Sequence, residues 1–288
     1  MTEIWEQHKT IAHYSNLNSI LSILKSREFH ASRFDYLEDQ TEIVYAKNIL
    51  KNAMCDKYKK RDSHLIYKAV CHELDKLVYP AMGGDIFIIS FSQIKNNLQA
   101  TESENDGFLS MWRYYAKDDG CYIEFDTEAL WTLWESWYDN RVGMVFDHVI
   151  YDTKANNDSQ KLAQEFIEEY KKIYIDGKFL GPFFTLAARC KHPAFIDERE
   201  IRLVILNGLP NIKSILSTHA KPCGKIYIKF PFEPKAVKKI VIGPSKDQCM
   251  IYQQIEHCLD SIAAYSHVEI AKSNIPVVIH QNEPNENI

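Results

Sequence analysis

The chain has 288 residues, of which 45% are hydrophobic and 25% charged, which is the composition of an ordinary globular protein. This composition excludes a disordered, collagen-like or coiled-coil chain. The formal net charge of −5 provides no overall positive field for nucleic acid or an anionic membrane. Any anionic ligand must therefore be held by local charges.

No apolar run approaches the roughly 18 to 20 residues that span a bilayer. The first nine residues are polar and lack the basic and apolar regions of a signal peptide. The seven cysteines include no Cys-x-x-Cys pair, which is typical of reduced thiols and not of a disulfide framework or a zinc site. We therefore predict a cytoplasmic protein that needs no metal ion.

The chain opens with a predicted strand and a helix. Ile11–Ser15 reads as a short strand, and Asn16 or Asn18 caps a helix whose apolar residues recur at helical spacing. A long polar stretch, Lys47–Leu77, predicts two helices broken near Asp62, which form an insertion at about residues 44–80. Its lysines are interpreted as a solvated face in preference to a nucleic-acid surface.

The middle of the chain alternates short elements. Asp85–Phe91 is a β-rich strand after a Gly-Gly break, and Met111–Ala116 is a short helical segment. Cys121–Phe125 is a strand, and Thr127 caps the helix that follows it. The tryptophans of that helix fall at helical spacing, which indicates core packing and not a cofactor site.

The second half continues in the same mixed manner. Its expected elements are a strand at Val145–Tyr151, helices at Asp158–Tyr174 and Phe183–Cys190, strands at Glu200–Leu206, Lys225–Phe230 and Lys239–Gly243, a helix at Asp247–Ala263 and a strand at His267–Ala271. This order lacks a strict βαβα rhythm and predicts an α+β fold with a central mixed sheet. We expect one compact domain over residues 1–280 and a flexible tail at 281–288.

Six short motifs in register resemble the bacterial domain-of-unknown-function family 2971. They are His13-Tyr14-Ser15, Leu37–Glu42 with Asp39, Ser90-Phe91-Ser92, Met111–Ala116 with Gly120, Lys191–Phe195 with Glu198, Glu200 and Arg202, and Ile242–Ser245. The resemblance covers roughly Ile11 to Pro276. It fails near the end, where Val277-Val278 stands in place of the aromatic-arginine pair expected of the family.

The acidic segment near Glu198 carries its own chemistry. If it is a strand, a period of two places apolar side chains on one face and Glu198, Glu200 and Arg202 on the other. Two carboxylates so placed raise the free energy unless a cation, a proton or a ligand compensates them, and perturbed acids often mark functional sites. A structural ion pair with Arg202 is the plain alternative.

A purely structural explanation also exists for Ser90, Ser92 and His13. A serine pair on a strand is commonly its wet face, and a strand histidine is often hydrogen-bonded structure. Taken together, an early His, a middle Ser-x-Ser and a late Glu-x-Glu resemble the order of landmarks in the ADP-ribosyltransferase fold. This resemblance implies a split central sheet and NAD as co-substrate.

The resemblance implies catalytic roles for Glu200, Glu198 and His13. Cleaving the bond between nicotinamide and ribose develops positive charge on the sugar, which a carboxylate stabilises as in glycoside cleavage. A serine would brace the glutamate, a tyrosine would stack on the nicotinamide ring, and nearby cations would hold the phosphates. The candidate cofactor-binding residues are Ser90, Ser92, Tyr114, Tyr115, Arg113, Arg202, Lys191 and Arg33.

Within the Trp112–Ala116 segment, α-helical spacing predicts that Trp112 and Tyr115 anchor the core while Tyr114 faces the cleft.

Two rival sites remain open. The Gly243-Pro244-Ser245 turn before a helix is either a phosphate site or an ordinary connection capped by Ser245. The second rival is a divalent-cation site for phosphodiester cleavage, formed by Asp39, Glu42, Glu198 and Glu200.

The leading prediction is an NAD-using transferase of ADP-ribosyltransferase type, acting as a bacterial toxin or defence effector. Its partners would be a small nucleotide and an acceptor macromolecule, either protein or nucleic acid, with no membrane. The alternative is a non-catalytic ligand-sensing or protein-interaction module. A metal-dependent nuclease is a further alternative, although no Glu-x-Lys follows an acidic strand in the usual nuclease manner.

Overall fold

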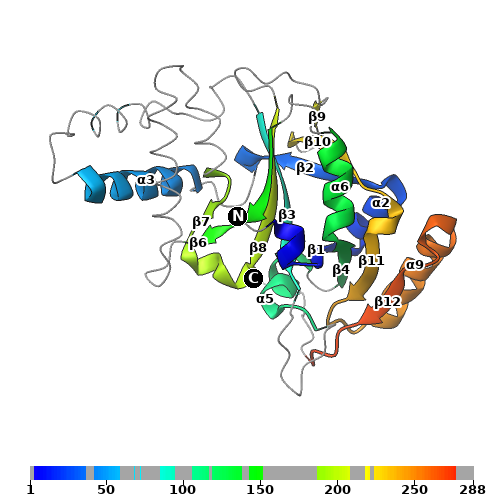
Figure 1. The fold of residues 1–288 in the computed structure, drawn as a ribbon. Helices are drawn as coiled ribbons and strands as arrows, with labels where there is room; N and C mark the ends of the chain where they lie inside the picture. Colours follow the sequence, from blue (N-terminus) through cyan, green and yellow to red (C-terminus); the bar gives the residue numbers. More distant parts are fainter. Residues whose placement is uncertain are drawn as a thin grey trace.

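A mixed β-sheet forms the centre of the molecule (Figure 1). The computed structural model describes residues 3–36, 42–58, 68, 72, 85–94, 106–116, 119–137, 143–151, 187–207, 218–220 and 224–276. Within these ranges the sheet has ten strands. They are β1 (Thr10–Asn16), β2 (Glu28–Arg33), β3 (Asp85–Gln93), β4 (Gly120–Asp126), β5 (Gly143–His148), β8 (Glu200–Asn207), β9 (Thr218–Ala220), β10 (Ile226–Pro231), β11 (Val237–Ile242) and β12 (Glu269–Lys272).

The strand order is β12-β11-β4-β1-β3-β2-β10-β9, and β8 pairs with both β3 and β5. All these pairs are antiparallel except β11 with β12, which is parallel. A separate parallel pair joins β6 (Ile150–Tyr151) to β7 (Cys190–Lys191). The mixed sheet and interspersed helices confirm the predicted α+β class.

The sheet splits along one edge of β3. β8 pairs with β3 from Asp85 to Ser92 and so fills one of its two edges. On the other edge, β2 pairs only at Phe87 and Ile88, and β1 pairs only at Ser92 and Gln93. The backbone around Ser90 therefore faces the point at which β1 and β2 separate.

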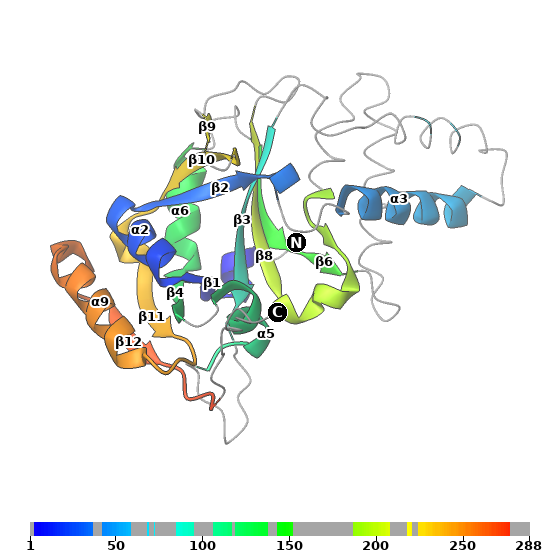
Figure 2. The ribbon, with the colours of Figure 1, turned by 180° about the vertical axis from the view of Figure 1, so that it is seen from behind.

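Three helices cover the half of the sheet that contains β1, β4 and β11. They are α2 (Leu17–Ser26), α6 (Thr127–Trp137) and α9 (Gln248–Asp260). Their buried side chains join one apolar core with the inward side chains of the strands. From both sides of the molecule, α3 (Glu42–Tyr58) extends away from this half, on the side that carries β6 and β7 (Figure 2).

Local chemistry explains where two helices begin. Asn16 caps α2 as predicted, because its side chain accepts a hydrogen bond from the Ser19 amide at 2.9 Å. The prediction that Thr127 caps α6 is wrong by one residue. Asp126, the last residue of β4, accepts from the Ala129 amide at 2.8 Å, and Thr127 is the first helical residue.

Tertiary contacts changed other predicted elements. The expected strand at Val145–Tyr151 is divided into β5 and β6, because β5 pairs with β8 whereas Ile150 and Tyr151 pair with β7. Cys190 begins β7 and does not end a helix. The sequence pattern also missed β2, a short strand with polar residues on one face.

The long helical insertion was predicted to start near residue 44, and α3 begins at Glu42. The rest of that insertion, the expected helix at Asp158–Tyr174 and the C-terminal tail lie outside the described residues, apart from Lys68 and His72, which are helical. The single-domain boundary at 1–280 remains a prediction.

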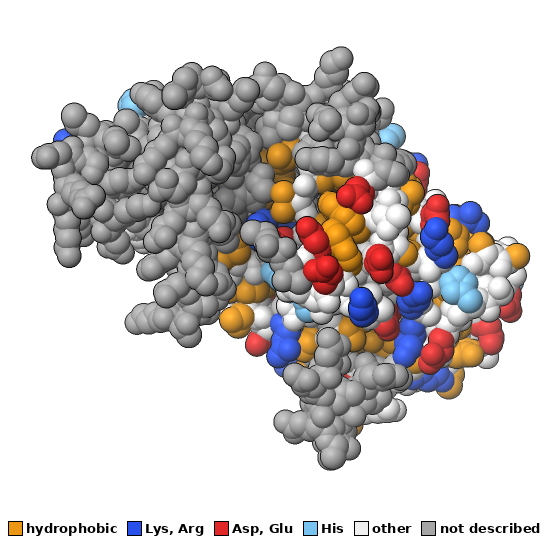
Figure 3. Space-filling view, viewed as in Figure 1, with side chains coloured by type: hydrophobic (Ala, Val, Ile, Leu, Met, Phe, Trp, Pro, Cys, Tyr) orange, Lys and Arg blue, Asp and Glu red, His pale blue; other side chains and the backbone are white. Residues whose placement is uncertain are grey.

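The predicted core tryptophans lie in or against the core. Trp134 is fully buried, and Trp131 stacks between Trp5 and Phe146. On the face shown in Figure 3, acidic and basic side chains of the described residues are interspersed. Within the described ranges, none of the helices has both the length and the apolar character that crossing a membrane requires.

Candidate active site

A cavity of about 410 Å³ lies beside the split in the sheet. Strands β1, β3 and β8 supply its floor, and the segments around residues 111–115 and 191–198 supply its walls. Eight of the predicted site residues line it: His13, Ser90, Tyr114, Tyr115, Lys191, Glu198, Glu200 and Arg202. Tyr36, Glu42, Met111 and Phe195 are among the other lining residues.

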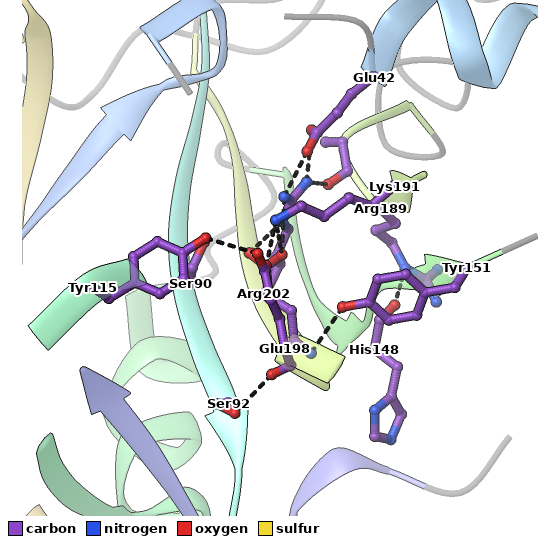
Figure 4. Close-up of polar contacts among 12 residues, drawn as sticks. Glu42, Ser90, Ser92, Tyr115, His148, Tyr151, Arg189, Lys191, Glu198 and Arg202 are labelled. Atoms are coloured by element: carbon purple, nitrogen blue, oxygen red, sulfur yellow. Dashed lines mark hydrogen bonds and ion pairs between the residues drawn. The ribbon is translucent and has the colours of Figure 1, made fainter. Parts of the chain in front are cut away.

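A chain of buried charges runs along this cavity (Figure 4). Arg202 donates from Nε to Glu200 Oε1 at 2.7 Å and binds both oxygens of Glu42 at 2.8 Å. Lys191 donates from Nζ to Glu200 at 3.1 Å and to Glu198 at 2.5 Å. All five side chains are buried, so three carboxylates share two cations.

The two glutamates therefore occupy different electrostatic environments. Burial by itself raises the pKa of Glu200, but Arg202 and Lys191 outweigh it and lower the value to about 2. For Glu198, burial is the largest cause and the pKa is raised, with only Lys191 as an opposing cation. Glu200 is thus ionised at neutral pH, while Glu198 holds its proton more tightly than an ordinary glutamate.

Glu198 reaches this position from an unexpected element. The strand predicted to begin near Glu198 starts at Glu200, and Glu198 ends the 3-10 helix η4 (Pro193–Glu198). Arg199 lies between them in the left-handed backbone region at a φ of 45°. This turn, and not strand periodicity, brings both carboxylates to Lys191.

His13 of β1 contacts β3 at the point where β1 and β2 separate. Its Nδ1 donates to the Ser90 carbonyl at 2.9 Å, and its ring packs edge-on against Phe29 and Phe91. Burial lowers the pKa of His13. Its neutral ring therefore has a fixed orientation beside the cavity.

The two serines have different surroundings. The Ser90 hydroxyl hydrogen-bonds Glu200 and thereby helps to lower the pKa of that carboxyl. Ser92 is fully buried and donates to the backbone carbonyl of Glu198 at 2.7 Å. Ser90 thus braces one glutamate directly, and Ser92 fixes the backbone of the other.

The tyrosines both line the cavity, which corrects the predicted facing. The segment Trp112–Ala116 is a π-helical turn, η2, which follows the short helix α5 (Leu109–Met111), so α-helical spacing does not apply. Trp112 is fully buried as predicted, and Tyr114 is 68% exposed. Tyr115 does not simply anchor the core, because its hydroxyl donates to Glu198 Oε1 at 3.0 Å.

The four predicted phosphate-binding cations fall into two groups, one inside the cavity and one outside it. Lys191 and Arg202 pair with carboxylates in the cavity. Arg33 pairs with Asp35 at 2.7 Å and stacks on Tyr36, and Arg113 is exposed outside the lining. Arg33 and Arg113 are therefore not among the residues that line the cavity.

The nuclease reading placed a divalent cation among the acidic residues. Asp39 lies outside the described residues, but Glu42 and Glu200 meet at the Arg202 guanidinium, which takes the place that a cation would fill. In the described part of the chain, no three His, Cys, Asp or Glu side chains gather as metal ligands. The acidic residues form an ion-pair chain there.

The sequence left the role of Glu42 open and missed Tyr36 and Phe195. Glu42 lies far from Arg202 in the sequence and meets it only through the packing of α3. Phe195 lies over the Lys191 ammonium at 4.9 Å. Its place in the Lys191–Phe195 motif was the signal that could have identified it.

The Gly243-Pro244-Ser245 turn has a packing explanation. A Cβ at Gly243 would lie 2.7 Å from the Trp112 ring, so only glycine fits under that side chain. The Gly243 amide donates to the Gly120 carbonyl, and the Ser245 hydroxyl accepts from the Asp247 amide at 3.1 Å. The turn is an ordinary connection into α9.

The motifs around η2, η4 and β8 coincide with a known family model. The family described as protein of unknown function (DUF2971) matches residues 111–203. These residues are similar to that family. The DUF2971 match includes Tyr114, Tyr115, Lys191 and both cavity glutamates of η4 and β8, and it confirms the resemblance over that part of the chain.

Several solved structures of DarT from Thermus sp. 2.9 are similar to the chain. The complex with carba-NAD+ gives a TM-score of 0.34 at 9% identity, covering 92% of this chain and 95% of that chain. The complex with ADP-ribosylated single-stranded DNA gives 0.34 at 10% identity, over 94% and 97%. The NAD+ complex gives 0.31 at 10%, over 92% and 94%. No curated protein sequence matches the chain.

Proposed function

We propose that this protein is an NAD-using transferase of the ADP-ribosyltransferase type. One observation carries the proposal: a single cavity places two glutamates with oppositely shifted pKa values beside a histidine, a serine and two tyrosines. Paired carboxyl groups whose environments separate their pKa values are the usual arrangement for cleaving a glycosidic bond. The bond between nicotinamide and ribose is of that kind.

The size of the site supports a dinucleotide. The cavity of about 410 Å³ adjoins a second one of about 290 Å³, and both share His13 and Ser90. The second cavity is lined by further serine hydroxyls, including Ser15, Ser19 and Ser32. Hydroxyls suit the sugar and base of a second nucleoside, so the two cavities match the two halves of NAD.

The proposed roles follow from charge and position. Glu200, ionised and braced by Ser90, stabilises the positive charge that develops on the ribose. Nicotinamide leaves with the electron pair of the broken bond, and an acceptor nucleophile forms the new bond to the sugar carbon. Glu198, with its raised pKa, takes the proton of that nucleophile, and Tyr114 offers its exposed ring for stacking.

An enzyme that modifies a macromolecule with ADP-ribose fits a toxin or defence effector acting in the cytoplasm. The direct test incubates the full chain with NAD and measures released nicotinamide, while labelled NAD reports transfer to added protein or nucleic acid. Glu200→Gln should abolish the release. Binding of NAD without any release would overturn the enzyme proposal and favour the non-catalytic module.

A further inference from the structure

The ion-pair chain of the cavity, which consists of Glu42, Arg202, Glu200, Lys191 and Glu198, has more anions than cations (Figure 4). Arg202 binds Glu42 and Glu200. Lys191 binds Glu200 and Glu198. Each cation therefore lies between two carboxylates, and a carboxylate stands at each end. Among the described residues no other Lys or Arg pairs with these carboxylates, so three anions and two cations leave a net charge of −1 when all are ionised.

Burial gives this unbalanced charge its importance. None of the five residues is more than 6% exposed, so water compensates the extra charge poorly. Burial is the largest cause that raises the pKa of both terminal carboxyls, Glu42 and Glu198, whereas two cations lower the pKa of the central Glu200. As the pH falls, a proton therefore binds first at an end of the ion-pair chain.

The same balance decides which kind of ligand group fits beside the ion-pair chain. Lys191 and Arg202 are already paired, so a phosphate placed here would meet an excess of negative charge. A positively charged group would instead neutralise that excess. The diphosphate of a dinucleotide therefore belongs elsewhere, and this part of the cavity suits a cation.

The lining narrows the cation to a flat aromatic one. Aromatic side chains of the cavity wall include Tyr36, Tyr114 and Phe195. Phe195 already lies over the Lys191 ammonium at 4.9 Å, and aromatic faces attract cations. The oxidised nicotinamide of NAD is a planar ring that carries one positive charge, whereas free nicotinamide is neutral.

We propose that the unbalanced carboxylate of the ion-pair chain selects a positively charged aromatic ring, the oxidised nicotinamide of NAD, and that this ring displaces to water the proton which Glu42 or Glu198 otherwise holds. Glu42, which the transfer reaction itself does not use, is thereby a specificity-determining residue. Its role rests on the proposed transferase function. Cleavage turns the charged ring into neutral nicotinamide, which no longer balances the carboxylate and so leaves the cavity more readily.

Two small probes separate the charge of the ring from its shape. 1-Methylnicotinamide carries the positive ring, nicotinamide is its neutral counterpart, and neither contains the ribose bond that a transferase would cleave. In ligand-observed NMR titrations of the full chain at about pH 7.5, 1-methylnicotinamide should bind about tenfold more tightly. This preference should shrink as the pH falls to about 5, because protons compete for the same carboxylate.

Variants identify the group that is responsible. Glu42→Gln keeps the side-chain shape and balances the ion-pair chain, so the preference should fall to about twofold or less and lose its pH dependence. Glu198→Gln removes the charge at the other end and should do the same, which keeps the test decisive if one variant does not fold. Glu256→Gln, at an exposed position on α9, should keep the preference of the parent.

The other titratable side chains of the described residues that line the cavity or contact the ion-pair chain are His13, Tyr14, Tyr36, Tyr114, Tyr115 and Tyr151. Tyrosines ordinarily ionise near roughly pH 10, so His13 is the competing group in the acidic range. A pH dependence that persists in Glu42→Gln would assign it to His13 and overturn the proposal.

Equal affinity of the parent for the two rings, or binding of neither ring, would also overturn the proposal. Release of nicotinamide from NAD in a parallel assay shows whether the transferase function survives such a result. If NAD is cleaved although the rings are not distinguished, only the charge selection fails. If NAD is neither bound nor cleaved, the proposed function fails as well.

Discussion

Glu198 and Glu200 show how two identical side chains acquire different chemistry. Both are buried, and burial raises the pKa of each. Glu200 receives hydrogen bonds from a guanidinium, an ammonium and a hydroxyl, whereas Glu198 shares only the ammonium and gains a tyrosine hydroxyl. The number of cations in contact thus decides whether the pKa of each carboxyl is lowered or raised.

The first prediction concerns Glu198. As the proton acceptor it must be ionised, so the transfer rate should rise with pH through its pKa, which burial places above the ordinary 4.5. Glu198→Gln should slow transfer on the order of a hundredfold and remove this pH dependence, with NAD binding retained. Glu256→Gln, at an exposed position on α9, is the matched control. A full rate with an unaltered pH profile would contradict the role.

The second prediction concerns the stability that Glu200 contributes. Its pKa is lowered from 4.5 to about 2 on folding, so its contribution is present above pH 4.5 and is lost as the pH falls through about 2. Glu200→Gln should cost about 3 kcal/mol at pH 7. Urea unfolding at several pH values measures this, and the parent and the variant should converge near pH 2. A constant difference across this range would show that ion pairing is not the cause.

At the scale of elements, the π-helical turn η2 links the core to the cavity. Trp112 points into a cluster with Tyr14 and Tyr122, while Tyr114 and Tyr115 reach the cavity from the same turn. The indole N–H donates to the Asp106 carbonyl at 2.6 Å. The packing of one side chain therefore sets the position of two site residues.

The third prediction tests this packing through Gly243. Trp112→Ala should cost about 3 to 5 kcal/mol, as other large-to-small core changes do. Gly243→Ala should cost about 1 to 3 kcal/mol in the parent, because the new methyl meets the indole ring. In the Trp112→Ala background that second cost should largely disappear, which a thermodynamic cycle from urea unfolding measures. Additive costs would contradict the proposed contact.

At the scale of the whole molecule, the split sheet creates the site. β8 fills one edge of β3, and the other edge is divided between β1 and β2, with His13 between them. The two cavities meet at this division. A ligand that occupies both would touch four strands of one sheet, so its binding should stabilise the fold as a unit.

The fourth prediction follows from this coupling. NAD should raise the unfolding free energy by about 2.7 kcal/mol at a hundredfold excess over its dissociation constant, seen as an upward shift in thermal unfolding. Tyr114→Ala should reduce the binding free energy by about 1 kcal/mol with little change in stability, because that ring is 68% exposed. Met250→Ala, another exposed apolar position, serves as its control. A flat titration with NAD would count against the proposed ligand.

Local patterns in the sequence were sufficient for much of the fold. Short apolar, β-rich runs between turn signals located β1, β3, β4, β8 and β11, and the Asn16 cap located α2, because these signals depend on neighbouring residues. The motifs also singled out most residues that line the cavity. Whether those residues act as proposed is a prediction that the experiments above address.

Only the tertiary structure decided how these residues meet. Glu42 reaches Arg202 across 160 positions of sequence, and the turn at Arg199 brings Glu198 to Lys191 although Glu198 is not in the strand. Which carboxyl has a lowered pKa, and which cations are already paired, depends on distances of about 3 Å between such segments. Sequence spacing carries no information on those distances, because the packing of separate elements sets them.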